Sequence, residues 1–212
     1  MKKISLILCA VFFTAMTAGS AAAFTQNEFT TAESLEAGMT QTGIHFTLGE
    51  LSNMDYKSYY PAFRYGMGAF FEVGLKFGAT SLDIGSEDKL GALFGVDMKY
   101  QLIKEDDGIP LDMAISLGFD NTLISGRNVS EVTFATILSK GFPLADRGYK
   151  LTPYGGLEMS SLNGSSPYVP LDDTNVYIFG GLEWKVSQKF MMVFEVKAGE
   201  DTLGGFGIKF EY

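Results

Sequence analysis

Apolar side chains recur at every second position from about Met39 to the end of the chain. Groups of Gly, Pro, Asn, Asp or Ser interrupt this alternation at short intervals. A period of two predicts β-strands, because successive side chains of a strand point to opposite faces. Each segment is about as long as a tilted bilayer-crossing strand, for which ~9 to 11 residues suffice. We predict ten strands, at roughly residues 39–50, 58–66, 70–84, 89–103, 109–120, 129–140, 149–160, 174–186, 190–199 and 203–212.

The two faces of the predicted strands differ in their chemistry. One face carries large apolar side chains and no charge, as at Phe71, Val73 and Leu75 on the third segment. The other face carries acids and bases in nearly balanced numbers, with many glycines between them. We predict that this second face lines a lumen with a network of ionisable side chains, consisting of His45, Arg64, Glu72, Lys76, Asp97, Lys99, Asp112, Glu131, Glu158, Glu183, Lys185, Glu195, Lys197 and Lys209.

The size of the apolar side chains indicates which face meets the lumen. Alternation alone fits a soluble barrel with an apolar interior as well as a membrane barrel with an apolar exterior. A ten-stranded soluble barrel would have to pack a Phe from most strands into one lumen, whereas the same bulk turned outward meets lipid without crowding. We therefore predict an all-β fold, a closed antiparallel up-and-down transmembrane β-barrel. Ten strands are expected and eight remain possible, because segment 58–66 is short and segment 203–212 carries glycines; an even number is typical.

Aromatic residues gather near one end of the predicted barrel. If the mature amino terminus is periplasmic, the odd segments run outward and the even segments return. Such aromatic belts are typical of the two interfaces of a membrane barrel. The predicted periplasmic belt consists of Tyr65, Phe71, Tyr100, Tyr149, Trp184, Phe190 and Tyr212.

The first residues have the pattern of a secretory signal peptide. Lys2 and Lys3 form a positive start, an apolar stretch follows to about Ala18, and residues 21–23 are three alanines. Cleavage after Ala23 would remove the single cysteine, Cys9. The predicted organisation is a signal peptide at 1–23, a short periplasmic N-terminal segment at 24–38 and the transmembrane barrel at 39–212.

Composition narrows the possible chemistry. Lys and Arg number 16 against 25 Asp and Glu, a net charge of −9, and no basic cluster occurs, so a nucleic-acid partner is disfavoured. With one histidine and one cysteine, the sequence predicts no metal site and no cofactor. A hydrolase would use His45 to activate a nucleophile, but Ser52 lies at least ~20 Å away along an extended strand. We expect His45 to be a luminal residue bonded to neighbouring carboxylates; a catalytic Ser or acid from another strand remains the alternative.

The last strand carries a family resemblance. The ending Gly205-Phe206-Gly207-Ile208-Lys209-Phe210-Glu211-Tyr212 alternates apolar residues and finishes on an aromatic one. In this the chain resembles the bacterial outer-membrane β-barrel proteins, particularly the small OmpA-like and OmpX-like membrane domains. The resemblance implies a Gram-negative outer membrane, contact with its lipid and lipopolysaccharide, and an assembly signal for the barrel assembly machinery. That signal would comprise Phe206, Ile208, Phe210 and Tyr212, with Tyr where a terminal Phe is common.

The balanced luminal charges predict the barrel's function only broadly. Isolated charges in a narrow lumen are costly to desolvate, so near balance indicates mutual pairing and a plugged interior. We expect an integral outer-membrane barrel with a structural, surface-interaction or narrow-pore (porin-like) role and no enzymatic activity. Two alternatives remain open, an outer-membrane hydrolase acting on lipid or peptide, and a soluble periplasmic lipocalin-like barrel that binds a ligand.

Overall fold

A computed structural model describes residues 28–51, 54–84, 87–105, 108–124, 127–144, 149–164 and 174–212. The predicted signal peptide, residues 24–27 and Ser52 lie outside these ranges. No helix among the described residues is long and apolar enough to cross a membrane. The strands are Thr40–Leu51 (β1), Met54–Gly68 (β2), Phe71–Ile84 (β3), Glu87–Ile103 (β4), Asp112–Ile124 (β5), Arg127–Ser139 (β6), Phe142–Leu144 (β7), Tyr149–Gly164 (β8), Thr174–Lys185 (β9), Phe190–Ala198 (β10) and Thr202–Glu211 (β11).

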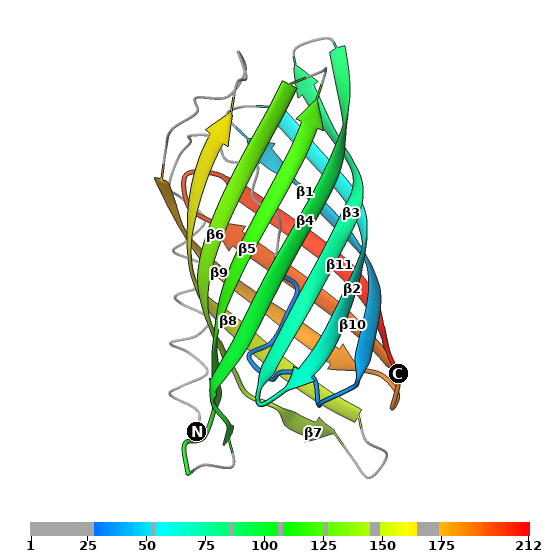
Figure 1. Cartoon of the computed structure of the whole chain (residues 1–212), viewed down its shortest axis with the longest axis vertical. Helices are drawn as coiled ribbons and strands as arrows, with labels where there is room; N and C mark the ends of the chain where they lie inside the picture. The colour runs from blue at the N-terminus through cyan, green and yellow to red at the C-terminus, as the bar shows by residue number, and fades with distance from the viewer. Residues whose placement is uncertain are drawn as a thin grey trace.

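The strands form one closed antiparallel barrel (Figure 1). Strands that follow one another along the chain pair, except that β6 pairs directly with β8 and not with the short β7. Strand β11 pairs with β1. The barrel wall therefore has ten strands, β1 to β6 and β8 to β11, while β7 is a three-residue addition to the edge of β8. The predicted all-β, up-and-down barrel is confirmed, with ten strands rather than eight.

The segment predicted for strand β2 is too short, because the first half of this strand breaks the apolar–polar alternation. Tyr56 and Tyr60 point inward and are buried, and Ser58 lies between them on the same face. Large aromatic rings on the luminal face hide the period-two signal, so the sequence placed the strand start at residue 58 instead of 54. Strand β7 was also missed, since three residues within a predicted turn carry too little pattern.

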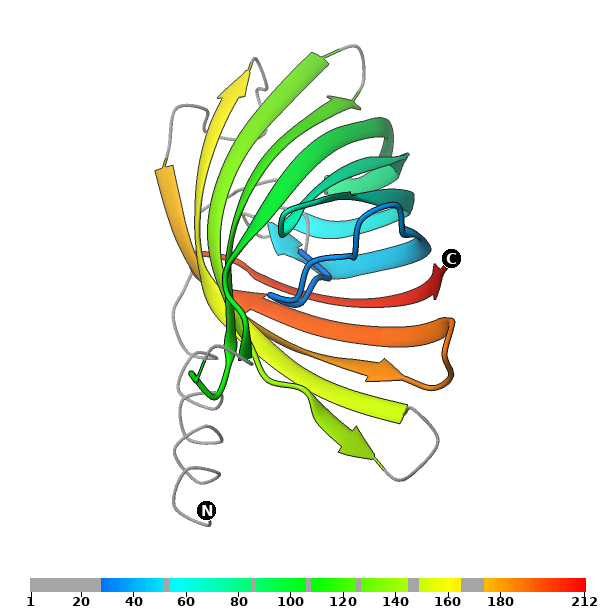
Figure 2. The same cartoon turned by 60° about the horizontal axis from the view of Figure 1, so that its bottom comes forward.

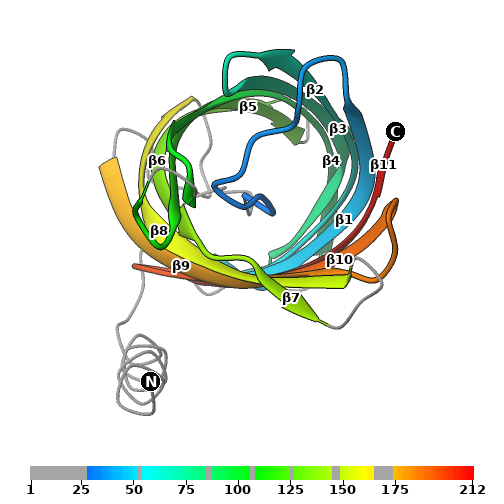
Figure 3. The ribbon, with the colours of Figure 1, turned by 90° about the horizontal axis from the view of Figure 1, so that it is seen from below.

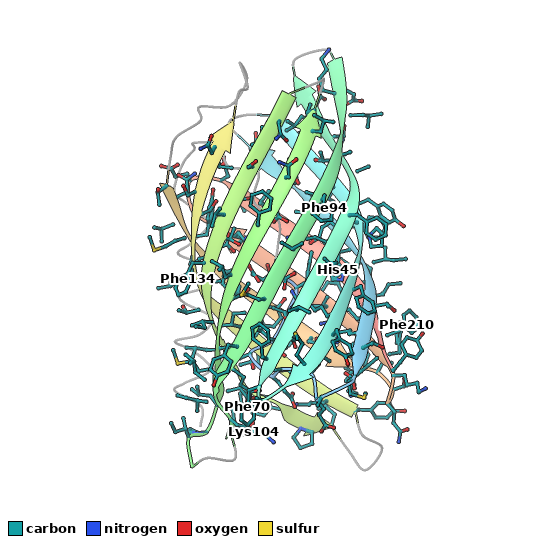
Figure 4. All side chains as sticks on the ribbon, in the orientation of Figure 1. His45, Phe70, Phe94, Lys104, Phe134 and Phe210 are labelled. Carbon is teal, nitrogen blue, oxygen red and sulfur yellow. The ribbon has the colours of Figure 1, made fainter. Side chains whose placement is uncertain are left out.

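The apolar face of the strands points away from the lumen. Phe94, Phe134 and Phe210 lie on the outer side of the wall, and His45 lies inside it (Figure 4). Phe77, for example, is 59% exposed, whereas Lys197 is fully buried. Water around such a surface would expose an apolar band far larger than soluble proteins carry, so this arrangement contradicts the soluble lipocalin-like alternative.

The chain that precedes β1 runs inside the barrel. Figures 2 and 3 show the blue segment curving from the start of β1 into the lumen. The reversal occurs at residues 37–38, where Gly38 adopts φ +81°, a left-handed conformation that favours glycine. Gly66 permits the close approach of this turn, because a Cβ there would lie 2.1 Å from the carbonyl oxygen of Glu36. We call residues 28–36 the plug, and the barrel end that they enter the plug end.

The plug contributes to the buried core. Its Phe29 and Ala32 are 1% and 0% exposed and join a cluster of apolar luminal residues. The sequence assigned this stretch to a short periplasmic segment and did not predict that it enters the barrel. The cluster consists of Phe29, Ala32, Tyr60, Leu93, Ala114, Ala135, Ile137, Tyr154, Phe179 and Val193.

Candidate functional site

A network of ion pairs joins β2, β3 and β4 inside the lumen. The Arg64 guanidinium lies 2.7 Å from Glu72 and 2.6 Å from Asp97. The Lys99 ammonium lies 3.1 Å from the same Glu72 carboxylate. Glu72 and Lys99 are opposite each other in the β3–β4 register, so the antiparallel ladder itself brings them together.

Another ion pair lies farther from the plug end than Glu72 does. Lys76 of β3 lies 2.7 Å from Asp120 of β5 and bridges the intervening β4. Gly95 of β4 makes room for this pair, because a Cβ there would lie 1.9 Å from an Asp120 carboxylate oxygen and 2.5 Å from the Lys76 side chain. A glycine on the luminal face therefore allows two long charged side chains to meet across a strand.

The most deeply buried ion pair joins β8 to β10. Lys197 lies 2.6 Å from Glu158, and both side chains are 0% exposed. Nearby, the Ser160 hydroxyl donates a hydrogen bond to the buried Glu131. This part of the lumen is therefore filled by protein side chains.

The remaining predicted luminal charges lie toward the plug end. Lys209 pairs with Glu183, and Lys185 lies 3.3 Å from Glu211. Asp112, at the start of β5, instead accepts hydrogen bonds from the Gln101 side-chain amide at 2.9 Å and from the Glu105 backbone at 3.0 Å. The structure thus places the predicted residues along one lumen but in several separate groups.

Glu195 links the barrel wall to the plug. Its two carboxylate oxygens accept hydrogen bonds from the backbone amides of Glu28 and Phe29, each at 2.8 Å. The Tyr154 hydroxyl donates a third, also at 2.8 Å. A buried carboxylate that binds backbone amides anchors the plug regardless of the plug's own side-chain charges.

His45 is enclosed by aromatic rings rather than by carboxylates. Its ring centre lies 4.8 Å from that of Phe29, in an edge-to-face arrangement, and 5.3 Å from that of Tyr60. Neither imidazole nitrogen has a hydrogen-bond partner among the described residues. The expectation that neighbouring carboxylates bind His45 is therefore wrong, because the plug inserts Phe29 beside the imidazole.

Two cavities remain beside the plug. A cavity of about 20 Å³ at mid-height is lined by His45, Arg64, Lys76 and Asp97, among others, and is large enough for about one water molecule. A second cavity, of about 410 Å³, lies between the plug and the wall at the plug end. No group of three or more potential metal ligands of the His, Cys, Asp and Glu types occurs in the part of the chain that the structure describes.

The predicted aromatic belt lies at one end of the barrel. Phe71 is opposite Tyr100 in the β3–β4 register, and Trp184 is the next-to-last residue of β9. Phe190 contacts Phe210 with ring centres 5.2 Å apart. The other members, Tyr65, Tyr149 and Tyr212, also lie beside the strand ends of the plug end. Phe70 and Lys104, labelled at the lower end in Figure 4, occupy the same level.

The last strand closes the barrel with its apolar residues outward. Phe206, Ile208 and Phe210 of β11 are opposite Phe46, Ile44 and Thr42 of β1. Tyr212 follows the strand, and its backbone exchanges hydrogen bonds with Thr40. A strand in this position completes the wall, and its role as an assembly signal stays a prediction.

Sequence reasoning missed several luminal residues. Asp120 lies on the same strand face as the predicted Asp112, eight positions further on. The period-two alternation could therefore have identified it. Tyr60 and Tyr154 are inward aromatic residues, which a rule that places rings outward cannot find. The plug carried no such signal, because its segment has no strand-like alternation.

No family model and no curated protein matches the chain. The β domain of the Bordetella autotransporter BrkA has a similar structure, with a TM-score of 0.54 and 10% identity, over 84% of this chain and 100% of its own. The N-terminal β-barrel domain of OprF from Pseudomonas aeruginosa aligns over 84% and 100% (12% identity, TM-score 0.38). An outer membrane channel from Pseudomonas putida F1 aligns over 90% and 100% (11% identity, TM-score 0.45).

The fold and the surface chemistry define a class. A closed antiparallel barrel with an apolar exterior and a polar, charged lumen is a transmembrane β-barrel of the outer-membrane type. The resemblance to outer-membrane β-barrel proteins is confirmed at the level of fold, and the bacterial outer membrane is the location that this fold implies. The ten strands exceed the eight of the small OmpA-type and OmpX-type barrels.

Proposed function

We propose that this protein is a closed, non-enzymatic barrel of the bacterial outer membrane, with a structural or surface-interaction role rather than that of an open pore. Its plug end faces the periplasm, and the opposite end, where β8 ends and β9 begins, faces outward. The observation that carries this proposal is the plug. Residues 28–36 enter the lumen and are bound there by Glu195 and Lys99.

The luminal ion pairs support a closed barrel. A water-filled pore needs a continuous polar passage, but Lys197 and Glu158 are fully buried against each other. Lys76, which lines the mid-height cavity, pairs with Asp120. Beside them, the mid-height cavity has room for about one water molecule. Solute diffusion along this path would require several ion pairs to separate together.

The surroundings of His45 support a non-enzymatic role. A general base must reach the proton that it abstracts, at about 2.6–3.2 Å or through one water. His45 packs between Phe29 and Tyr60, and neither of its nitrogens has a partner among the described residues. A substrate would have to displace the plug before it reached the imidazole.

Single-channel recording in a planar bilayer tests the closed barrel. Purified mature protein should produce no stable conducting steps, under conditions in which an open trimeric porin, recorded in parallel, conducts. Steady conductance from the wild-type chain would overturn the closed barrel. Hydrolysis of phospholipid or lipopolysaccharide that a His45→Ala variant loses would overturn the non-enzymatic assignment.

A further inference from the structure

The barrel wall binds the plug mainly through the plug's backbone. Wall side chains accept hydrogen bonds from the amides of residues 28 and 29 (Glu195), Ala32 (Ser139 Oγ, 3.1 Å), Ser34 (Gln101 Oε1, 3.0 Å) and Leu35 (Glu72 Oε2, 2.8 Å). Wall ammonium groups donate to the carbonyls of Phe29 (Lys209, 3.2 Å), Thr31 (Lys99, 2.7 Å) and Glu33 (Lys99, 2.8 Å).

These contacts engage both N–H and C=O groups along a stretch of chain that bends at residues 32–33 and places Phe29 at φ +46°. Wall carboxylates and amide oxygens face the N–H groups, and wall lysines face the carbonyls. Any peptide that adopts the plug's bent shape presents the same backbone groups, so this part of the wall recognises a peptide main chain rather than one particular charge pattern.

Two plug side chains add sequence preference. Phe29 is 1% exposed and packs on His45 and Tyr60, with ring-centre distances of 4.8 and 6.4 Å. Ala32, three positions later, is 0% exposed beside Ser139. The site therefore selects an aromatic residue followed, after two others, by a small one. Glu36 is exposed, and the exposed Glu33 adds an ion pair with Lys150 of the wall.

The plug is joined to the wall strands at one end only among the described residues. It belongs to no strand, and it joins β1 through the turn at Ala37 and Gly38. The 410 Å³ cavity separates one side of the plug from the wall. Plug residues such as Thr30 and Glu36 line it on one side, and wall residues such as Lys150 and Glu183 line it on the other. Peptide can therefore approach the site from the plug end.

We propose that the lumen at the plug end is a peptide-binding site that the chain's own residues 28–36 occupy. Its ligand class is a peptide that adopts the plug's bent shape, with the pattern aromatic, any two residues, small residue. Such a peptide, supplied by another polypeptide, binds when the plug is displaced. This inference goes beyond the closed barrel proposed above and does not depend on whether the lumen conducts.

The test measures binding of a dye-labelled synthetic peptide of residues 26–37 to the full mature protein in detergent, by fluorescence anisotropy. The plug variants Phe29→Ala and Ala32→Glu weaken the competing internal segment while leaving every wall strand unchanged. Each should bind the peptide at least about tenfold more tightly than the wild-type chain does, since a competitor held in place lowers the apparent affinity. Two variants are used so that the test still works if one of them fails to fold. Heat-modifiable gel migration shows which variants have folded.

Modified peptides separate main-chain recognition from unspecific binding. N-methylation of the peptide at Phe29 and Ala32 removes two amide donors and keeps the side chains. It should weaken binding about tenfold or more, because one of these donors meets a buried carboxylate. N-methylation at the exposed Ala37 is the matched control and should leave affinity unchanged, and a peptide with Phe29→Ala should bind at least about tenfold more weakly.

Two results would overturn the proposal. Equal affinity of the wild-type chain and both plug variants for the peptide would mean that the peptide binds outside the plug's site. Equal affinity of the parent and the doubly N-methylated peptide would mean that the wall does not recognise the main chain. Either result is separate from the conductance measurement that tests the closed barrel.

Discussion

The ion pair of Lys197 and Glu158 provides a quantitative test of a dry lumen. At their separation of 2.6 Å, and with an effective dielectric constant of about 20, the Coulomb attraction is about 6 kcal/mol. Desolvation of the two fully buried ions offsets most of it, at several kcal/mol for each ion. Lys197→Met removes one partner and leaves the Glu158 carboxylate buried alone, so we expect a loss of about 3–5 kcal/mol of unfolding free energy.

The double variant Lys197→Met with Glu158→Met separates loss of the pair from creation of a buried charge. With both ions gone and similar volume in their place, stability should return to within about 1 kcal/mol of the wild type or exceed it. Urea unfolding in phospholipid vesicles, followed by the fluorescence of the single tryptophan, Trp184, measures both variants. A loss below about 1 kcal/mol for Lys197→Met, or a double variant no more stable than the single one, would refute a water-free lumen around this ion pair.

Two further substitutions test the outer face and the plug. Val96→Lys, near mid-height on the outer face of β4, should cost about 2–4 kcal/mol in vesicle unfolding, whereas Leu90→Lys, near the end of the same strand and 75% exposed, should cost about 0–1 kcal/mol; equal losses would contradict the assigned depth. Gly66→Ala places a methyl group against the turn that leads into the plug, so chymotrypsin should cleave after Phe29 faster than in the wild type. Gly204→Ala, with open space at its Cβ, is the control and should cleave at the wild-type rate.

Two physical constraints made the barrel wall predictable. A pleated strand turns alternate side chains to opposite faces, and lipid accepts only apolar ones, so each strand carries the same period-two signal. This fixed β3 and β4 closely, with predicted ranges of 70–84 and 89–103 against Phe71–Ile84 and Glu87–Ile103. Where inward rings replace polar residues, as at Tyr56 and Tyr60, the signal weakened and the strand start was misplaced.

Sequence reasoning did not predict the plug because its contacts are of a kind that sequence pattern does not encode. Its backbone groups bind side chains far away in the chain, such as Glu195 and Lys99, and any residue supplies such groups. The predicted environment of His45 was wrong for the same reason, because only the folded chain brings Phe29 next to the imidazole. The charged residues of the lumen could be identified because they occupy alternate positions along each strand. Their ion-pair partners, in contrast, depend on the strand register and on which strands are neighbours.

Depth-dependent fluorescence quenching by brominated lipids tests most directly whether lipid surrounds the apolar face. The native Trp184, 42% exposed at the plug end, should be quenched most by lipids brominated near the head group. A Phe94→Trp variant in a Trp184→Phe background places the indole near mid-height of β4, where bromine deep in the acyl chains should quench it most. If neither tryptophan responds to brominated chains while aqueous acrylamide quenches both strongly, water rather than lipid surrounds this face, and the barrel does not span a membrane as described.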